Sequence, residues 1–135
     1  MNSIKEEISI HWFRQDLRLL DNPALHSATQ SGSVLPIYIL DDINSGDYKI
    51  GAASRWWLHK SLKILNSSLS NNLEIYIGDP QTILAELVIK HDVKAVYWNR
   101  CYEPWRVKRD SAIKTLLEKQ NVSVKTFNGS LLWEP

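Results

Sequence analysis

The chain has 135 residues, of which 44% are hydrophobic and 23% are charged, and these values are typical of one globular domain rather than of a disordered segment. The net charge of +1 excludes a domain-wide basic surface that binds nucleic acid through phosphate contacts alone. The sequence has no apolar run of membrane-spanning length, no signal peptide in its first ten residues, and a single cysteine, Cys101, so we expect a cytoplasmic protein without an internal disulfide.

Apolar strands alternate with helix-length segments along the chain. The strands are expected at 8–13, 34–40, 73–77, 95–98 and 122–127. The helices are expected at 22–31, 52–69, 79–90 and 103–120, and three of them begin with a capping residue and a proline: Asn22-Pro23, Asp79-Pro80 and Glu103-Pro104. This alternation predicts an α/β fold with a Rossmann-like five-stranded parallel sheet in the order 3-2-1-4-5 and helices on both faces.

Two segments and the tryptophans allow specific predictions about packing. The run VLPIYIL (34–40) is typical of a strand covered on both faces, with Pro36 near its start or at a bulge. The helix 52–69 has apolar residues with helical spacing at positions 53, 57, 58, 62, 65 and 69. Trp56, Trp98 and Trp105 are candidates for a flat aromatic pocket, but core packing is favoured for Trp56 and Trp98.

The most heavily charged loops follow the first and fourth strands. In a sheet ordered 3-2-1-4-5 the strand order reverses between these two strands, and ligands of such sheets bind at the carboxyl ends there. In the first loop, Arg14 and Asp16 suit bidentate recognition of a polar ligand, but an internal ion pair is favoured. After the fourth strand, the basic residues are expected to form a solvated face offset by Glu103 and Asp110; they are Arg100, Arg106, Lys108 and Arg109.

Several common kinds of site have no motif in this sequence. There is no glycine-rich dinucleotide or phosphate loop, and Gly51 by itself indicates a turn before a helix. The four histidines are scattered, so no metal site is expected. No nucleophile-elbow pattern occurs, and no catalytic residue is predicted.

Ordered segments of the chain resemble the photolyase/cryptochrome family. They are HWFRQDLRLLDNPAL (11–25), GAASRWWLHKSL (51–62) and VYWNRCYEP (96–104), followed by Arg109-Asp110. The resemblance implies an N-terminal α/β domain at residues 1–135 that holds a light-harvesting antenna pigment. In the family, the catalytic FAD lies in a following helical domain of several hundred residues, and we expect residues 1–135 to be a fragment without that domain.

The resemblance therefore implies the antenna-binding domain of a deoxyribodipyrimidine photolyase, a lyase that repairs DNA with light. The domain alone is expected to have no repair activity. Its partners would be the FAD-binding domain of the same protein and, through the whole protein, damaged DNA. The alternatives are a cryptochrome-type photoreceptor domain and a stand-alone nucleotide-binding or interaction module.

The residues that the resemblance assigns to the antenna pocket follow two strands and begin one helix. They are Asp41 and Asp42 after the second strand, Ile50, Gly51 and Arg55 at the second helix, and Asn99, Arg100, Cys101, Glu103 and Trp105 after the fourth strand. Bacterial folate-binding members carry an asparagine and an acidic residue where this chain has Trp105 and Arg106, so a deazaflavin or FMN is favoured over folate. The expected interface with the second domain consists of Arg14, Gln15, Asp16, Leu131, Leu132 and Trp133.

Overall fold

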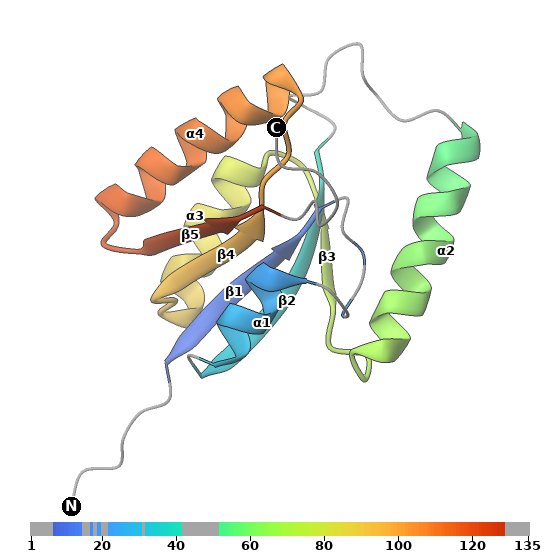
Figure 1. Cartoon of the computed structure of the whole chain (residues 1–135), viewed down its shortest axis with the longest axis horizontal. Coiled ribbons are helices and arrows are strands. Elements are labelled where there is room, and N and C mark those ends of the chain that lie inside the picture. The colour runs from blue at the N-terminus through green and yellow to red at the C-terminus, as the bar shows by residue number, and fades with distance from the viewer. Residues whose placement is uncertain are drawn as a thin grey trace, which may run out of the picture.

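The computed structural model describes residues 7–14, 17, 19, 22–30, 32–41 and 52–128, with only the backbone described at 52–54. The predicted sheet is confirmed: the strands lie in the order β3-β2-β1-β4-β5, and all neighbours are parallel (Figure 1). The strands are β1 (Ile8–Phe13), β2 (Ser33–Leu40), β3 (Glu74–Ile77), β4 (Ala95–Asn99) and β5 (Ser123–Phe127). The helices are α1 (Pro23–Thr29), α2 (Ala52–Ser68), α3 (Pro80–His91) and α4 (Pro104–Lys119).

Two of the three predicted helix starts are capped by a side chain. The carboxamide of Asn22 accepts a hydrogen bond from the Leu25 amide, and the carboxylate of Asp79 accepts one from the Gln81 amide. The third prediction is wrong in this respect, because Glu103 occupies the capping position of α4 without a side-chain capping bond. Its longer side chain reaches Arg106 instead, with 3.4 Å between the carboxylate oxygen and Nε.

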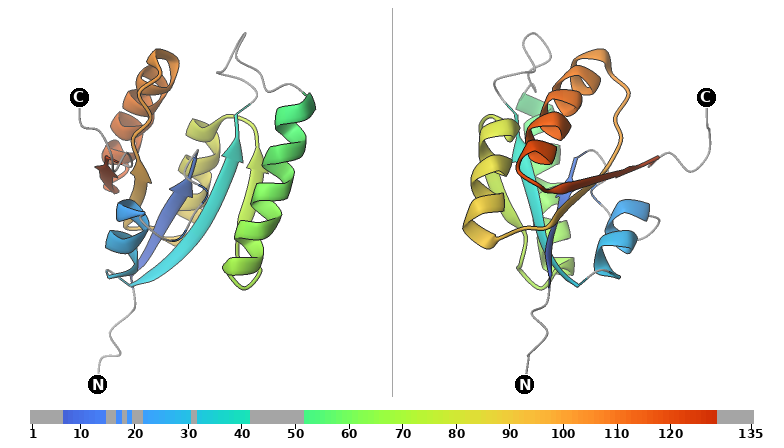
Figure 2. Two further views of the ribbon diagram at one scale, coloured as in Figure 1. Left: turned by 45° about the vertical axis from the view of Figure 1, so that its right-hand side comes forward. Right: turned by 90° about the vertical axis from the view of Figure 1, so that its left-hand side faces the viewer.

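Helices cover both faces of the sheet, as predicted (Figure 2). α3 and α4 pack on one face, and α1 and α2 pack on the other. Successive residues of a strand point to opposite faces, so Trp12 and Trp98 lie on the α3–α4 side while Phe13 and Tyr38 lie on the α2 side. The larger core consists of Ile10, Trp12, Ile37, Ile39, Leu84, Leu87, Val88, Val93, Val96, Trp98, Ile113, Leu117 and Val122.

The second strand fits its apolar sequence. Residues Ile37 to Ile39 are buried, and core packing of Trp98 is also confirmed, at 1% exposed. β3 pairs with β2 only from Ile37 onward, so at the level of Pro36 the paired neighbour is β1. The N–H that proline lacks therefore need not break a ladder bond, and Pro36 lies in the first half of the strand, as expected.

The outer face of α2 differs from the prediction. Trp56 and Trp57 are 60% and 64% exposed, so core packing of Trp56 is wrong and Trp57 does not belong to the buried stripe. The two rings contact each other edge to face at 5.8 Å, and the Lys60 ammonium lies 5.1 Å from the Trp56 ring centre. Of the predicted stripe, Leu62 and Leu65 are buried against the sheet.

We predict that Gly32 tolerates substitution less well than Gly78, although their φ values, +136° and +142°, are similar. In Gly78→Ala, positive φ alone costs about 1–3 kcal/mol. In Gly32→Ala, the new Cβ would in addition lie 2.5 Å from the Glu7 carbonyl oxygen, which accepts the Ser33 amide at the start of β2. Urea unfolding of both variants should show the larger loss for Gly32→Ala, and equal losses would contradict the close approach.

We predict that His11 makes the fold sensitive to mild acid. Burial lowers the pKa of His11 from 6.5 to about 3, so the unfolded chain takes up this proton at a higher pH than the folded chain. The contribution to stability is therefore complete above pH 6.5 and is lost as the pH falls toward 3. At 1.36 kcal/mol per pH unit, about 2 kcal/mol is lost between pH 7 and pH 5. The variant His11→Leu should show a correspondingly smaller loss in unfolding experiments at the two pH values.

Candidate functional site

Four charged side chains meet at the carboxyl end of the sheet. Arg14 follows β1, Asp41 follows β2, and Arg109 and Asp110 lie in α4. Arg14 Nη2 donates to Asp110 Oδ2, Arg109 Nε donates to the other Asp110 oxygen at 3.2 Å, and Arg109 Nη1 donates to Asp41 at 3.1 Å. We call this alternating chain of charges, Arg14–Asp110–Arg109–Asp41, the buried ion network.

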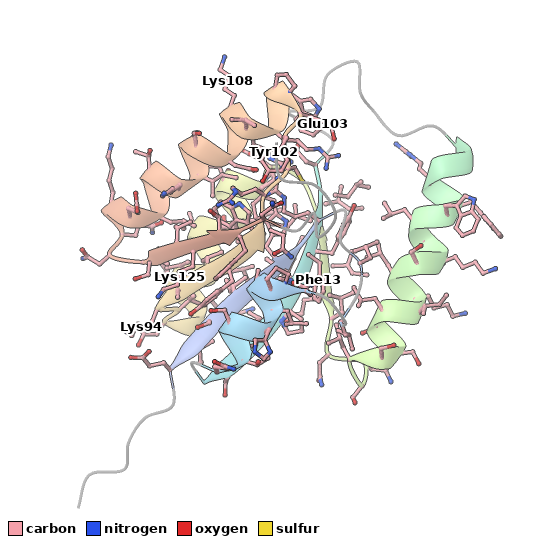
Figure 3. All side chains as sticks on the ribbon, in the orientation of Figure 1. Phe13, Lys94, Tyr102, Glu103, Lys108 and Lys125 are labelled. Atoms are coloured by element: carbon pink, nitrogen blue, oxygen red, sulfur yellow. The ribbon has the colours of Figure 1, made fainter. Side chains whose placement is uncertain are left out.

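The buried ion network corrects the prediction of a solvated basic face for Arg109 and Asp110, whereas Arg100 and Lys108 are exposed as predicted. The Arg109 side chain is 9% exposed and the Asp41 side chain 4%, whereas the prediction placed Arg109 and Asp110 in solvent. Arg14 forms an internal ion pair with Asp110 of α4, whereas Asp16, the partner expected within the loop, lies outside the described residues. Figure 3 shows that Lys108, by contrast, points away from the sheet. Burial is tolerated because cations and carboxylates alternate along the network.

Tryptophan rings surround the two guanidinium groups. The Arg14 guanidinium lies 4.7 Å from the Trp12 ring centre and 5.9 Å from that of Trp98. Arg109 lies between Trp12 and Trp105, at 5.1 Å from each ring centre. Burial lowers the pKa of Arg14, and the charge of Asp110 opposes that effect. The network is thus an apolar-walled, charge-balanced contact between α4 and the sheet.

Side chains of the protein itself occupy the point where the strand order reverses. Asn99, at the end of β4, donates to the Asn22 side chain at 2.7 Å and accepts from the Ala24 amide at 3.2 Å. Its carbonyl oxygen accepts from Arg14 Nη1 at 3.3 Å. These bonds join the exits of β1 and β4 to the start of α1. The described polar side chains at the exits of β1 and β4 are therefore engaged in bonds within the domain.

The other predicted residues after β4 lie around the start of α4, where Figure 3 labels Tyr102 and Glu103. Arg100 is exposed and donates to Thr126 at 3.4 Å, and Cys101 is half-buried and accepts from Arg106 at 3.6 Å. A cavity of about 220 Å³ lies beside them. It is lined by Trp98, Arg100, Cys101, Tyr102, Val107, Asp110, Ser111, Lys114 and Thr126.

A larger groove, of about 410 Å³, lies between α2 and the strands β2 and β3. We call it the α2 groove. Its lining residues are Tyr38 and Leu40 from β2, Ile75 and Ile77 from β3, and Arg55, Leu58, His59, Leu62, Lys63 and Asn66 from α2. Arg55 is the one described residue of the predicted pocket that lines it. The other lining residues were not predicted from the sequence, although the spacing of Arg55, His59 and Lys63 places them on one helix face.

Tyr38, which lines the α2 groove, lies within the electrostatic influence of two arginines of α4. Burial raises the pKa of the Tyr38 hydroxyl, and the positive charges of Arg106 and Arg109 partly oppose this rise. Those arginines are therefore close enough to act on a residue that lines the groove. The groove also includes Leu40 and Ile77, the last residues of β2 and β3, so it reaches the carboxyl end of these two strands.

Part of the predicted site lies outside the described residues. These predictions concern Gln15, Asp16, Asp42, Ile50, Gly51, Leu131, Leu132 and Trp133. Within the described ranges, no three residues among His, Cys, Asp and Glu are grouped so that they could hold a metal ion. No helix in those ranges is both long and apolar enough to cross a membrane.

Comparisons with known proteins agree with the fold. A family model described as DNA photolyase matches residues 9–135. The chain is 41% identical to a deoxyribodipyrimidine photo-lyase of Agrobacterium fabrum, over 98% of this chain and 28% of that protein. It is 37% identical to cryptochrome-1 of Arabidopsis thaliana, over 94% of this chain and 19% of that protein. The chain thus spans less than a third of these relatives.

Two solved structures are also similar. A class III photolyase from Agrobacterium tumefaciens superposes with a TM-score of 0.90 at 40% identity, covering 99% of this chain and 28% of that chain. An archaeal photolyase from Sulfolobus tokodaii, described with two FAD molecules and the implication of a novel light-harvesting cofactor, has a TM-score of 0.78 at 28% identity. It covers 90% of this chain and 29% of that chain.

We predict that Asp110→Asn destabilises the chain by about 3–5 kcal/mol, because the two buried guanidinium groups lose the carboxylate that they share. The matched control is Asp92→Asn, which removes the carboxylate of an exposed pair with Lys94, where the side chains are 65% and 54% exposed. That change should cost about 0–1 kcal/mol. Similar losses for both variants in urea unfolding would argue against a stabilising network.

Proposed function

Because the chain belongs to the DNA photolyase family, we propose that residues 1–135 form an N-terminal α/β domain that binds the antenna chromophore of a light-driven DNA repair protein. The whole protein would be a deoxyribodipyrimidine photolyase, a carbon–carbon lyase. Its FAD would lie in a following helical domain that also contacts damaged DNA. On this proposal the present domain absorbs light and passes the energy on, and has no repair activity alone.

The observation that carries the proposal is the α2 groove. Its volume of about 410 Å³ lies within the range of roughly 300–1,000 Å³ that is usual for small-molecule sites. Its lining is largely apolar, with Leu40, Ile75 and Ile77 on the strand side and Leu58 and Leu62 on the α2 side. The flat face of a pigment ring fits between such walls.

The lining also supports a flavin-type pigment over folate. No carboxylate is among the described residues of the α2 groove, whereas a folate pterin ring pairs well with one. The similar Sulfolobus photolyase is described with two FAD molecules. We therefore propose that the antenna is a deazaflavin or a flavin such as FMN.

A second place for the ring is the start of α4, where the predicted residue Trp105 lies. The Trp105 ring has the guanidinium groups of Arg106 and Arg109 at 4.9 Å and 5.1 Å from its centre. A pigment that stacked on Trp105 would have to share or displace those cations. This competition favours the α2 groove over the start of α4.

A second candidate function is a cryptochrome-type photoreceptor domain, which the 37% identity to a plant cryptochrome-1 supports. Both functions use an antenna domain, so they differ in what the whole protein does after absorbing light. Illumination of the whole protein with DNA that contains pyrimidine dimers separates them. Restored pyrimidines support the photolyase, and their absence in a protein that carries both pigments supports the photoreceptor.

We predict that filling the α2 groove abolishes antenna binding. The full-length protein should be reconstituted separately with FMN, a deazaflavin and a folate. The experiment should then be repeated with the variant Leu58→Trp, which places a large ring in the groove. The matched control is Ile64→Trp on the same helix, where the side chain is 60% exposed. We expect retention of FMN or the deazaflavin over folate in the wild type and in the control, and loss in Leu58→Trp.

The variant Trp105→Ala decides between the two places for the ring. If the pigment is retained in Trp105→Ala and lost in Leu58→Trp, the result supports the α2 groove as the place of the ring. A loss of about 1–3 kcal/mol in Trp105→Ala, the scale of aromatic stacking on bases, would place the ring at the start of α4 instead. Tight folate binding would overturn the assignment of the pigment class.

A further inference from the structure

We propose that Trp56 and Trp57, on the outer face of α2, form a docking site for the polypeptide that follows residue 135 in the whole protein. We call the two rings, together with Lys60, the tryptophan patch. This inference rests on the part of the proposed function that gives the domain a following polypeptide, and it holds whether or not the α2 groove binds a pigment.

The helix α2 carries large apolar side chains on two opposite faces. At 3.6 residues per turn, Trp56, Lys60 and Trp57 fall within an arc of about 100°. Leu62 and Leu65, which are buried against the sheet, lie on the other side of the helix. Helices that are apolar on opposite faces are typically buried on both. The described helices and strands cover the inner face and leave the two tryptophans 60% and 64% exposed.

The two rings form one fixed surface. Their centres are 5.8 Å apart in an edge-to-face contact, and the Lys60 ammonium lies 5.1 Å from the centre of the Trp56 ring. Single exposed apolar side chains, such as Ile89 at 74%, are normal on a protein surface, whereas contiguous ones mark interaction sites. Tryptophan is also enriched among the residues that dominate the energy of protein interfaces. A pair of rings that is already ordered loses little conformational freedom when another surface covers it.

The tryptophan patch lies at the end of the domain from which the chain continues. The helix α2 joins two parallel strands, so it begins at the carboxyl end of the sheet, and the two tryptophans lie in its first two turns (Figure 1). β5, the last described strand, ends at the same edge. Four strand spacings, or about 19 Å, separate β5 from β3, and about six extended residues span that distance. A polypeptide that continues beyond β5 therefore has a short path to the patch.

The occupant is better supplied by the same polypeptide than by a second copy. The chain covers 28% of the Agrobacterium fabrum photo-lyase, so more than two thirds of that relative lies outside the match. A tethered segment has an effective concentration of roughly millimolar, so it covers an apolar patch more completely than a free partner does. A symmetric pair of copies centred on the patch would bring two Lys60 ammonium groups together. We expect the covering surface to be apolar opposite the rings and to present an oxygen acceptor to Lys60, since a covered ammonium needs one.

Ile64 provides an internal control on the same helix. Its side chain is 60% exposed, as that of Trp56 is, but it lies about two turns further along α2, away from the carboxyl end of the sheet. A surface that covers only the first turns of α2 leaves Ile64 accessible to water.

The test is hydroxyl-radical footprinting of the purified full-length protein, with the oxidised side chains located by mass spectrometry. The oxidation rate of each side chain in the native protein is divided by its rate in the urea-unfolded protein, which removes differences in chemical reactivity. We expect Trp56 and Trp57 to be protected at least about tenfold and Ile64 less than about threefold, because docking excludes water from the patch alone. The protection should survive a dilution of about a hundredfold, because a contact within one polypeptide does not depend on protein concentration.

A variant identifies the occupant. Trp56→Ser/Trp57→Ser removes both rings and leaves Leu62 and Leu65 in place on the core face. Ile64→Ser is the matched control on the same helix. We expect new oxidation in the double variant at residues beyond 135, in the surface that the rings no longer cover, and none in the control.

Four results would overturn the docking site. Tryptophans that stay unprotected in the wild type would show that the patch is open in the whole protein. Protection that falls on dilution would assign the patch to a second copy, and protection that appears only after nucleic acid is added would assign it to nucleic acid. New oxidation confined to residues 1–135 would assign the cover to this domain.

This inference and the proposed function fail separately. Protected tryptophans in a full-length protein that binds none of the three pigments would overturn the antenna and leave the docking site standing. Unprotected tryptophans in a protein that binds FMN or the deazaflavin would do the reverse.

Discussion

The buried ion network, Arg14–Asp110–Arg109–Asp41, is the contact on which the carboxyl end of the sheet depends. It links the exits of β1 and β2 to the first turns of α4, and rings of three tryptophans enclose its guanidinium groups. Removing four charges from water is costly, so such a network is stable only when every charge has an opposite neighbour at hydrogen-bonding distance. Arg14, Arg109 and Asp110 therefore serve the fold before they serve any ligand.

This constraint bears on where the proposed antenna pigment could bind. Doubly wound sheets commonly bind ligands where the strand order reverses, but here Asn99 bonds to both Arg14 and Asn22 at that point. The larger of the two cavities described above lies beside the edge strand β3, under a helix whose outer face carries the exposed Trp56 and Trp57.

The sequence predicted the elements well and the pairing of charges poorly. Hydrophobic periodicity and the Asn22-Pro23 and Asp79-Pro80 starts are local signals, so the strands and helices appear close to their expected bounds. Arg109 and Asp110 lie in a helix rich in charge, and nothing local reveals that residues 14 and 41 neutralise them. Trp56 shows a related limit, because helical spacing groups side chains on one face without indicating which face is covered. Arg55 was predicted from the family resemblance, whereas His59 and Lys63 could be assigned to the groove only from the structure.

The position of β1 at the centre of the sheet also has a consequence for the order of folding. β1 is the first strand of the chain, yet it pairs with β2 on one side and with β4 on the other, where Ser9 lies opposite Ala95. During synthesis from the N-terminus, one edge of β1 has no partner until β4 has left the ribosome. Non-local parallel pairing of this kind forms slowly, and an unpaired apolar edge is prone to aggregate while it waits. A pause in translation between α1 and β4 would therefore be more harmful to this domain than a pause after β5.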